Sequence, residues 1–197
     1  MTNLIAYTRG CPEWDTLPKY ETGITVYPTE ADIHAYGQIC YDDKALYLHL
    51  AAEEKDIRAE MNDPMGQTCE DSCLEFFFRP DPKEMRYFNL EYNLNCCPFI
   101  GFGTSIEDLV RLHPLQIPFK ARANRTENGW EVFYQIPYSF IRLFFPSFSP
   151  KSGDSIYANF YKCGDKTALP HYYAWKQPAN RPHGFHCPEC FGEMIFE

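Results

Sequence analysis

Two short stretches of the sequence place carboxylates and amides where they can share one face. Residues 73–78 and 86–93 each alternate apolar and polar side chains, and an antiparallel hairpin would bring their non-core faces together. The side chains on that shared face are Glu75, Tyr87, Asn89, Glu91 and Asn93. Carboxylates and amides suit sugar hydroxyls, because each hydroxyl both donates and accepts a hydrogen bond. The pattern predicts a sugar-binding patch, with a solvated outer face of ordinary strand residues as the alternative.

Aromatic residues gather later in the chain, at Tyr172-Tyr173-Ala174-Trp175. An exposed Trp175 would present a flat apolar surface to the C–H face of a pyranose ring. The alternative is a Trp175 that packs into the core and pins its own loop. If the first interpretation holds, Trp175 is the stacking platform beside Glu75, Glu91 and Asn93, and Tyr173 and Asn159 are second-tier contacts.

The nine cysteines are an odd number at irregular spacing, which is typical of a protein with reduced, mostly buried thiols. Cys187 and Cys190 form a Cys-x-x-Cys pair beside His183 and His186. A structural zinc site would need four such ligands, and no second pair stands at zinc-finger spacing. Thiol redox chemistry is a further alternative, although no thioredoxin-like βαβ pattern surrounds the pair. We therefore expect plain packing and no bound metal at this motif.

Glu75 and Glu91 also suggest a second function, because glycoside hydrolysis uses two facing carboxylates. Nothing in their spacing separates an acid from a nucleophile. Other catalytic signatures are missing from the sequence, including the serine hydrolase elbow, the zinc protease motif and the phosphate-binding loop. A hydrolase using Glu75 and Glu91 remains the alternative to a non-catalytic sugar-binding protein.

The elements that must carry these residues are strands. Period-2 alternation recurs along residues 45–52, 73–78, 86–93, 117–124, 130–136 and 154–163, with turn residues between them. Short helices are expected only at residues 105–112 and 138–145, and a long loop at residues 165–193. The pattern predicts an all-β fold, an antiparallel two-sheet β-sandwich. The expected core residues are Leu46, Leu48, Leu74, Phe76, Phe88, Leu90, Val132 and Phe160.

Length and composition limit the function classes. A chain of 197 residues is expected to form a single domain, spanning 1–197. Its formal net charge of −9 disfavours a nucleic-acid partner and an anionic membrane surface. The sequence shows no signal peptide and no apolar run of membrane-spanning length, so we expect a cytoplasmic protein. The oligomeric state stays open.

Several of these segments resemble family 9 carbohydrate-binding-like domains. The segments are Glu70-Asp71-Ser72-Cys73-Leu74-Glu75-Phe76-Phe77, then Tyr87-Phe88-Asn89-Leu90-Glu91-Tyr92-Asn93, then Ala158-Asn159-Phe160-Tyr161-Lys162-Cys163, and the tail from Tyr173 to Phe196. The resemblance covers the chain from about Asp42 to its end. It implies a jelly-roll-like β-sandwich of the wider DOMON-like group, in which cofactor or haem modules also occur.

The resemblance also implies a site. Members of the family bind sugar chain ends between two Trp rings, and calcium can support their fold. Trp175 matches one of these rings, Glu75 matches a carboxylate and Asn93 matches an amide. The second ring would fall near Gln67-Thr68-Cys69, where the chain has no aromatic residue, and Glu91 stands where the family has a sugar-contacting Arg. We therefore expect weak binding of a neutral mono- or oligosaccharide.

Overall fold

Strands dominate the computed structural model, which describes residues 2–113 and 119–197. The strands are β1 (Leu4–Tyr7), β2 (Tyr20–Glu21), β3 (Ile24–Thr25), β4 (His34–Tyr41), β5 (Ala45–Glu53), β6 (Cys73–Arg79), β7 (Tyr87–Asn93), β8 (Pro98–Gly103), β9 (Val110–Arg111), β10 (Arg122–Arg125), β11 (Gly129–Pro137), β12 (Ser155–Gly164), β13 (His171–Ala174) and β14 (Gly192–Phe196). The helical elements are α1 (Tyr138–Ile141) and three 3-10 turns, Trp14–Thr16, Thr68–Glu70 and Pro188–Cys190. The predicted all-β class is confirmed.

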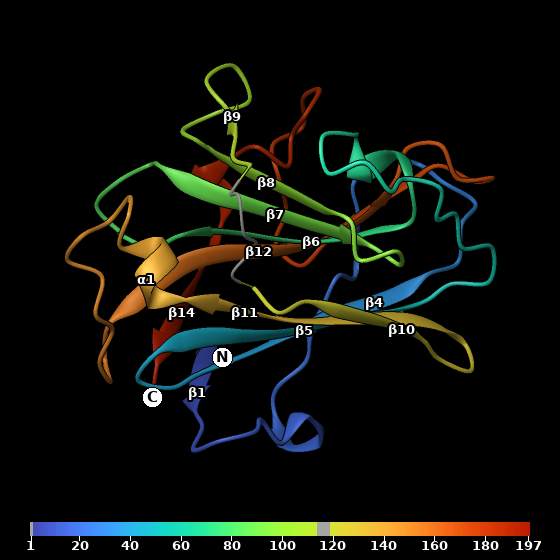
Figure 1. Ribbon diagram of the computed structural model, residues 1–197. Coiled ribbons are helices and arrows are strands. Elements are labelled where there is room, and N and C mark those ends of the chain that lie inside the picture. The colour runs from blue at the N-terminus through green and yellow to red at the C-terminus, as the bar shows by residue number, and fades with distance from the viewer. Residues whose placement is uncertain (1, 114–118) are drawn as a thin grey trace.

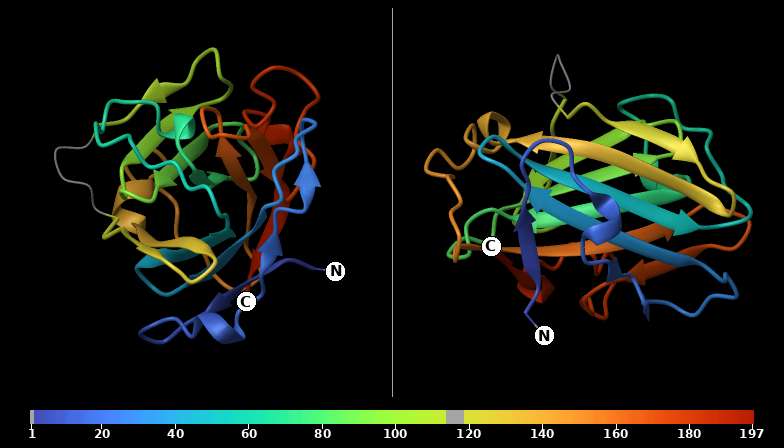
Figure 2. Two further views of the ribbon diagram at one scale, coloured as in Figure 1. Left: turned by 90° about the vertical axis from the view of Figure 1, so that its right-hand side faces the viewer. Right: turned by 90° about the horizontal axis from the view of Figure 1, so that it is seen from below.

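The strands form one hydrogen-bonded sheet that curls into two facing layers. Its order is β10-β11-β5-β4-β1-β14-β12-β6-β7-β8-β9. In Figure 1, β6, β7, β8 and β12 lie in the upper layer, and β4, β5, β10 and β11 lie below them. β1 joins the layers, because it pairs in parallel with both β14 and β4. The sandwich is therefore antiparallel except at this seam, where the two ends of the chain come close together (Figure 2).

Local chemistry explains where several strands begin and end. Asp42 accepts hydrogen bonds at Oδ1 from the backbone amides of Lys44 and Ala45, which closes the tight turn between β4 and β5. β6 ends at Arg79, directly before Pro80, which has no amide hydrogen to donate to a ladder. These turns set the register that aligns the apolar residues of neighbouring strands.

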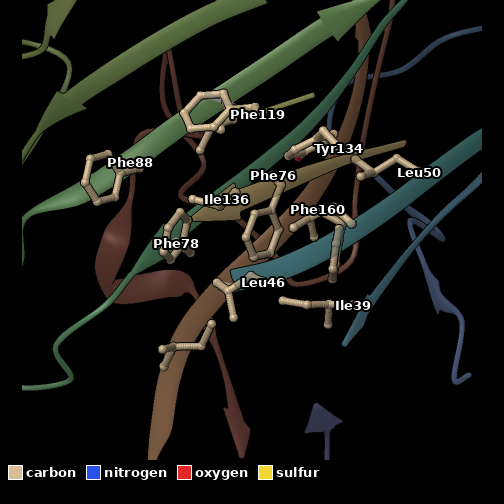
Figure 3. Packing of buried hydrophobic residues seen from close by; sticks show 14 of the residues in the cluster. Ile39, Leu46, Leu50, Phe76, Phe78, Phe88, Phe119, Tyr134, Ile136 and Phe160 are labelled. Atoms are coloured by element: carbon tan, nitrogen blue, oxygen red, sulfur yellow. The ribbon is translucent and has the colours of Figure 1, made fainter. Parts of the chain in front are cut away.

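The core fills the space between the two layers. All eight expected core residues lie in it, each no more than 1% exposed. Figure 3 shows Phe76, Phe78 and Phe160 from the upper layer facing Leu46 and Ile136 from the lower one. The period-2 prediction is confirmed for these strands.

Three sequence expectations differ from the structure or fall outside it. Residues 171–174 form β13, paired with β12 and β3, within the stretch expected to be a loop. Four residues are too few for alternation to reveal a strand. Of the two expected helices only Tyr138–Ile141 forms, because residues 104–108 close a turn around the Asp108 carboxylate. Ile117 of the expected strand 117–124 lies outside the described residues. No helix in the described ranges is long and apolar enough to cross a membrane.

Other segments of the chain cover the outer face of β6 and β7, and this covering determines where a ligand can bind. Both strands are buried at every position. A second apolar cluster forms on this face from Phe77, Tyr87, Tyr161, Ala174 and Phe191. The polar residues between them are therefore enclosed under loops, so the alternative of a solvated outer face is wrong.

Candidate functional site

A cavity of about 680 Å³ opens on the outer face of β6, β7, β8 and β12. Its floor comes from Glu75 on β6, Asn89 and Glu91 on β7, and Cys163 on β12. Loop residues near 67–70, 106–109, 165 and 182–186 form its walls. Three further cavities are smaller, at about 230, 390 and 440 Å³.

Glu75 and Glu91 lie directly opposite each other in the antiparallel register of β6 and β7. Both are nearly buried, at 2% and 6% exposure. Asn89 Nδ2 donates to Glu91 Oε1 at 3.1 Å, and Cys163 Sγ donates to Glu75 Oε1 at 2.7 Å. Asn89 Oδ1 is buried without a hydrogen-bond partner among the described residues. A ligand hydroxyl would satisfy that oxygen, since an unpartnered buried acceptor costs about 1–3 kcal/mol.

Burial raises the pKa of both carboxyl groups, so each holds its proton to a higher pH than an exposed carboxyl group does. It raises the pKa of Glu91 to about 7. The pKa of Glu75 lies well above its usual range, because of burial first and the neighbouring Glu91 second. A protonated carboxyl offers one donor and one acceptor, so the floor can serve hydroxyl groups in both roles.

Aromatic and aliphatic side chains surround this polar floor. Phe185 stacks on Tyr161 with 4.0 Å between ring centroids and 14° between planes. Tyr172 meets Tyr27 edge to face at 5.3 Å. Phe99 lines the other side, together with Ile106 and Leu109. Apolar walls around a few convergent polar groups are typical of small-ligand sites.

The structure brings Glu75 and Glu91 together in the cavity but separates Trp175 from them. The Trp175 ring is half-buried and packs against Tyr20 and Phe160, at 5.0 Å and 5.9 Å between centroids. Its backbone amide donates to Phe160 O. This geometry fits the alternative in which Trp175 anchors its own loop.

Tyr173, Asn93 and Asn159 also lie outside the cavity lining, where they anchor neighbouring segments. The Tyr173 hydroxyl donates to Ala31 O. Asn93 Nδ2 donates at 2.8 Å to Met61 O and to Asp71 Oδ2. Asn159 Nδ2 donates to Lys176 O, and Asn159 Oδ1 accepts from the Lys176 amide. These amides fix loops that frame the site, and neither of them lines the cavity.

Further residues line the cavity beyond the expected sugar contacts, among them Asn89, Phe99, Tyr172 and Phe185. Asn89 carries a signal in the sequence, because it shares the period-2 face of Glu91. Tyr172 stands in the aromatic cluster one position before Tyr173. No sequence signal marks Phe185 or Phe99 as a cavity residue, because their positions depend on how distant segments fold over the sheet.

Cys187 and Cys190 form a disulfide across the 3-10 turn Pro188–Cys190. The prediction of free thiols is wrong for this pair. Only two residues lie between the two cysteines, so a single turn brings their sulfurs together. The other seven cysteines are free thiols. His186, next to the disulfide, is held by the Tyr87 hydroxyl, with 2.6 Å between Tyr87 Oη and His186 Nδ1.

One cluster in the described ranges gathers potential metal ligands. The donor atoms of Cys73, Glu75 and Cys163 lie within 4.8 Å of one another. Calcium takes six to eight oxygen ligands, and this cluster offers two sulfurs and one carboxylate. The calcium that the family resemblance implies does not fit this donor set.

Comparisons with known proteins bear on the family and the fold. A family model described as carbohydrate-binding family 9 matches residues 27–196. A candidate carbohydrate-binding protein from Bacteroides uniformis is 25% identical, with 99% of this chain and 98% of that chain covered and a TM-score of 0.83. A search of curated proteins found no match.

Two solved structures from Caldicellulosiruptor kristjanssonii share the fold. A family 9 module in complex with cellotriose is 13% identical, covers 100% of this chain and 94% of its own, and has a TM-score of 0.70. A family 9 module in complex with glucose is 14% identical, covers 99% and 96%, and has a TM-score of 0.67.

Proposed function

The chain belongs to carbohydrate-binding family 9, and from that premise we propose that it is a non-catalytic protein that binds a neutral sugar in the cavity over Glu75, Asn89 and Glu91. The observation that carries the proposal is the floor of this cavity. It combines an unpartnered Asn89 oxygen with two buried carboxyl groups, between aromatic walls. Structural relatives in complex with cellotriose and glucose support the choice of ligand class.

Binding is expected to be weak. Phe185 is already stacked on Tyr161 on one side, so it offers a single ring face to a pyranose. One stacking face and a few neutral hydrogen bonds correspond to a dissociation constant in the millimolar range, about −4 kcal/mol. Acidic sugars are expected to bind less well than neutral ones, because a uronate would bring its negative charge close to Glu91, which with a pKa of about 7 is partly ionised at neutral pH in a partly desolvated site.

Calorimetric titration with glucose, cellotriose and glucuronate tests this proposal. Replacing the stacking ring in Phe185→Ala is expected to weaken neutral-sugar binding by at least about tenfold, since it removes an apolar contact worth roughly 1.5 kcal/mol or more. The matched control is Trp175→Phe, an aromatic replacement outside the cavity, which should leave the affinity unchanged. Unchanged binding in Phe185→Ala, or tighter binding of glucuronate than of glucose, would contradict the proposal.

The alternative, a glycan hydrolase, uses the same two carboxyl groups. A retaining or inverting glycosidase needs one ionised and one protonated carboxyl group at its working pH. The match to a carbohydrate-binding family model favours binding over hydrolysis. Release of reducing ends from cellotriose by the wild type, abolished in both Glu75→Gln and Glu91→Gln, would establish the alternative instead.

A further inference from the structure

Two buried thiols and a carboxyl group converge at one end of the cavity floor. Cys73 on β6 and Cys163 on β12 are direct partners in the antiparallel register of these strands. Glu75 lies two residues after Cys73 on the same face of β6, and its Oε1 is 2.7 Å from Cys163 Sγ. All three side chains are at most 2% exposed.

Among residues 2–113 and 119–197, no cation forms an ion pair with the Glu75 carboxyl group. In the described ranges, the ion pairs involve neither Glu75 nor Glu91. Lys162, the neighbouring buried cation, is paired with Glu54 at 3.2 Å. A bound cation would supply the positive charge that a buried, ionised Glu75 carboxylate requires, because an isolated buried charge is costly.

We propose that Cys73, Cys163 and Glu75 bind one thiophilic divalent cation of the zinc class at the floor of the cavity. Two sulfurs and one carboxylate oxygen are three of the four ligands of a tetrahedral site. Cys163 and Glu75 line the cavity, so the fourth position faces it and is open to water or to a hydroxyl group. Soft sulfur donors select zinc and cobalt over calcium and magnesium.

This site differs from the zinc interpretation considered for Cys187 and Cys190. Those two cysteines are joined as a disulfide. Sequence spacing could not reveal the new cluster, because Cys163 lies 88 residues from Glu75 and only the pairing of β6 with β12 joins them. The proposal reverses the expectation that the chain binds no metal, and its test requires no sugar.

Cobalt titration of the full-length reduced protein tests the site. We expect one Co²⁺ per chain, a thiolate-to-cobalt charge-transfer band in the near ultraviolet, displacement by Zn²⁺ and no displacement by Ca²⁺. Cys163→Ser should remove most of the band and lower the cobalt affinity by at least about tenfold, since even changes outside the ligand set typically cost that much. Glu75→Gln, which keeps the shape of the side chain, should lower the affinity while preserving the thiolate band.

Two controls make the result decisive. Cys40→Ser removes a buried free thiol of β4 away from the cavity and should leave cobalt binding unchanged. The double variant Cys187→Ser/Cys190→Ser should also bind one Co²⁺. Binding that is lost in this double variant but kept in Cys163→Ser would overturn the proposal, as would the absence of a thiolate band in the reduced wild type.

Discussion

Glu54→Ala is expected to lower the free energy of unfolding by about 3–5 kcal/mol, the usual cost of leaving a buried charge unpaired. Glu54 is 5% exposed and accepts hydrogen bonds from Ser72 Oγ at 2.6 Å and Trp130 Nε1 at 3.0 Å. It also pairs with Lys162 Nζ at 3.2 Å. The substitution would leave a fully buried ammonium group without its carboxylate and an indole N–H without an acceptor.

His171 cannot replace the missing charge. Burial and the adjacent Lys162 charge lower the pKa of His171 to about 4, so its ring is neutral at pH 7. Its Nε2 then accepts a hydrogen bond from Lys162 Nζ at 2.7 Å, and its Nδ1 donates to Leu169 O at 2.8 Å. The 3.7 Å approach of His171 Nε2 to Glu54 is therefore a contact of a neutral ring rather than an ion pair.

Chemical denaturation at pH 7 measures this effect. Glu53→Ala is the matched control, because Glu53 is the exposed neighbour on β5 and its removal should change stability by less than about 0.5 kcal/mol. The double variant Glu54→Leu/Lys162→Met removes both charges and should be more stable than Glu54→Ala. A Glu54→Ala protein as stable as the Glu53→Ala control would show that the network contributes little.

Glu91→Gln is expected to change how the stability of the metal-free protein depends on pH. The unfolded chain releases the Glu91 proton near the ordinary pKa of 4.5, whereas burial raises the pKa in the folded protein to about 7. Between these pH values the folded state binds more protons than the unfolded state, so stability falls as the pH rises. The rise in pKa corresponds to roughly 3 kcal/mol.

The glutamine variant removes this titration while keeping a neutral side chain of similar shape. Relative to the wild type, Glu91→Gln should therefore gain roughly 3 kcal/mol of stability between pH 4.5 and pH 8. Denaturant unfolding at several pH values, with chelator present, measures the difference. Glu127→Gln removes one exposed negative charge and serves as the control. A stability difference between wild type and Glu91→Gln that does not vary with pH would contradict the assigned environment of Glu91.

The sequence predicts the fold better than the site. Alternation along β6, β7 and β12 identifies Phe76, Leu90 and Phe160 as core residues, because one face of each strand must be buried. The same alternation places Glu75 opposite Glu91 once the two strands pair. Nothing in the sequence indicates that β1 pairs in parallel with its neighbours. Its four residues pair with β4 on one side and with β14, at the other end of the chain, on the other side.

The paths of the loops explain why the sequence did not reveal most of the residues that line the cavity. Nothing local distinguishes a Trp175 that stacks on a ligand from one that packs against Tyr20 and Phe160. Phe185 enters the cavity wall because residues 182–186 fold back over the sheet, where its ring meets Tyr161. Asn93 and Asn159 are polar strand residues like Asn89, but each finds backbone partners in a loop. Only the tertiary arrangement separates an anchor from a ligand contact.

Protein-observed NMR during glucose and cellotriose titration tests the position of the sugar site most directly. We expect the methyl signals of Ile106 and Leu109, which line the cavity, to shift and to show intermolecular NOEs to sugar protons. The Trp175 indole signal, outside the cavity, should stay unchanged. NOEs from sugar protons to the Trp175 indole, with the Ile106 and Leu109 methyl signals unmoved, would contradict the cavity over Glu75, Asn89 and Glu91 as the binding site.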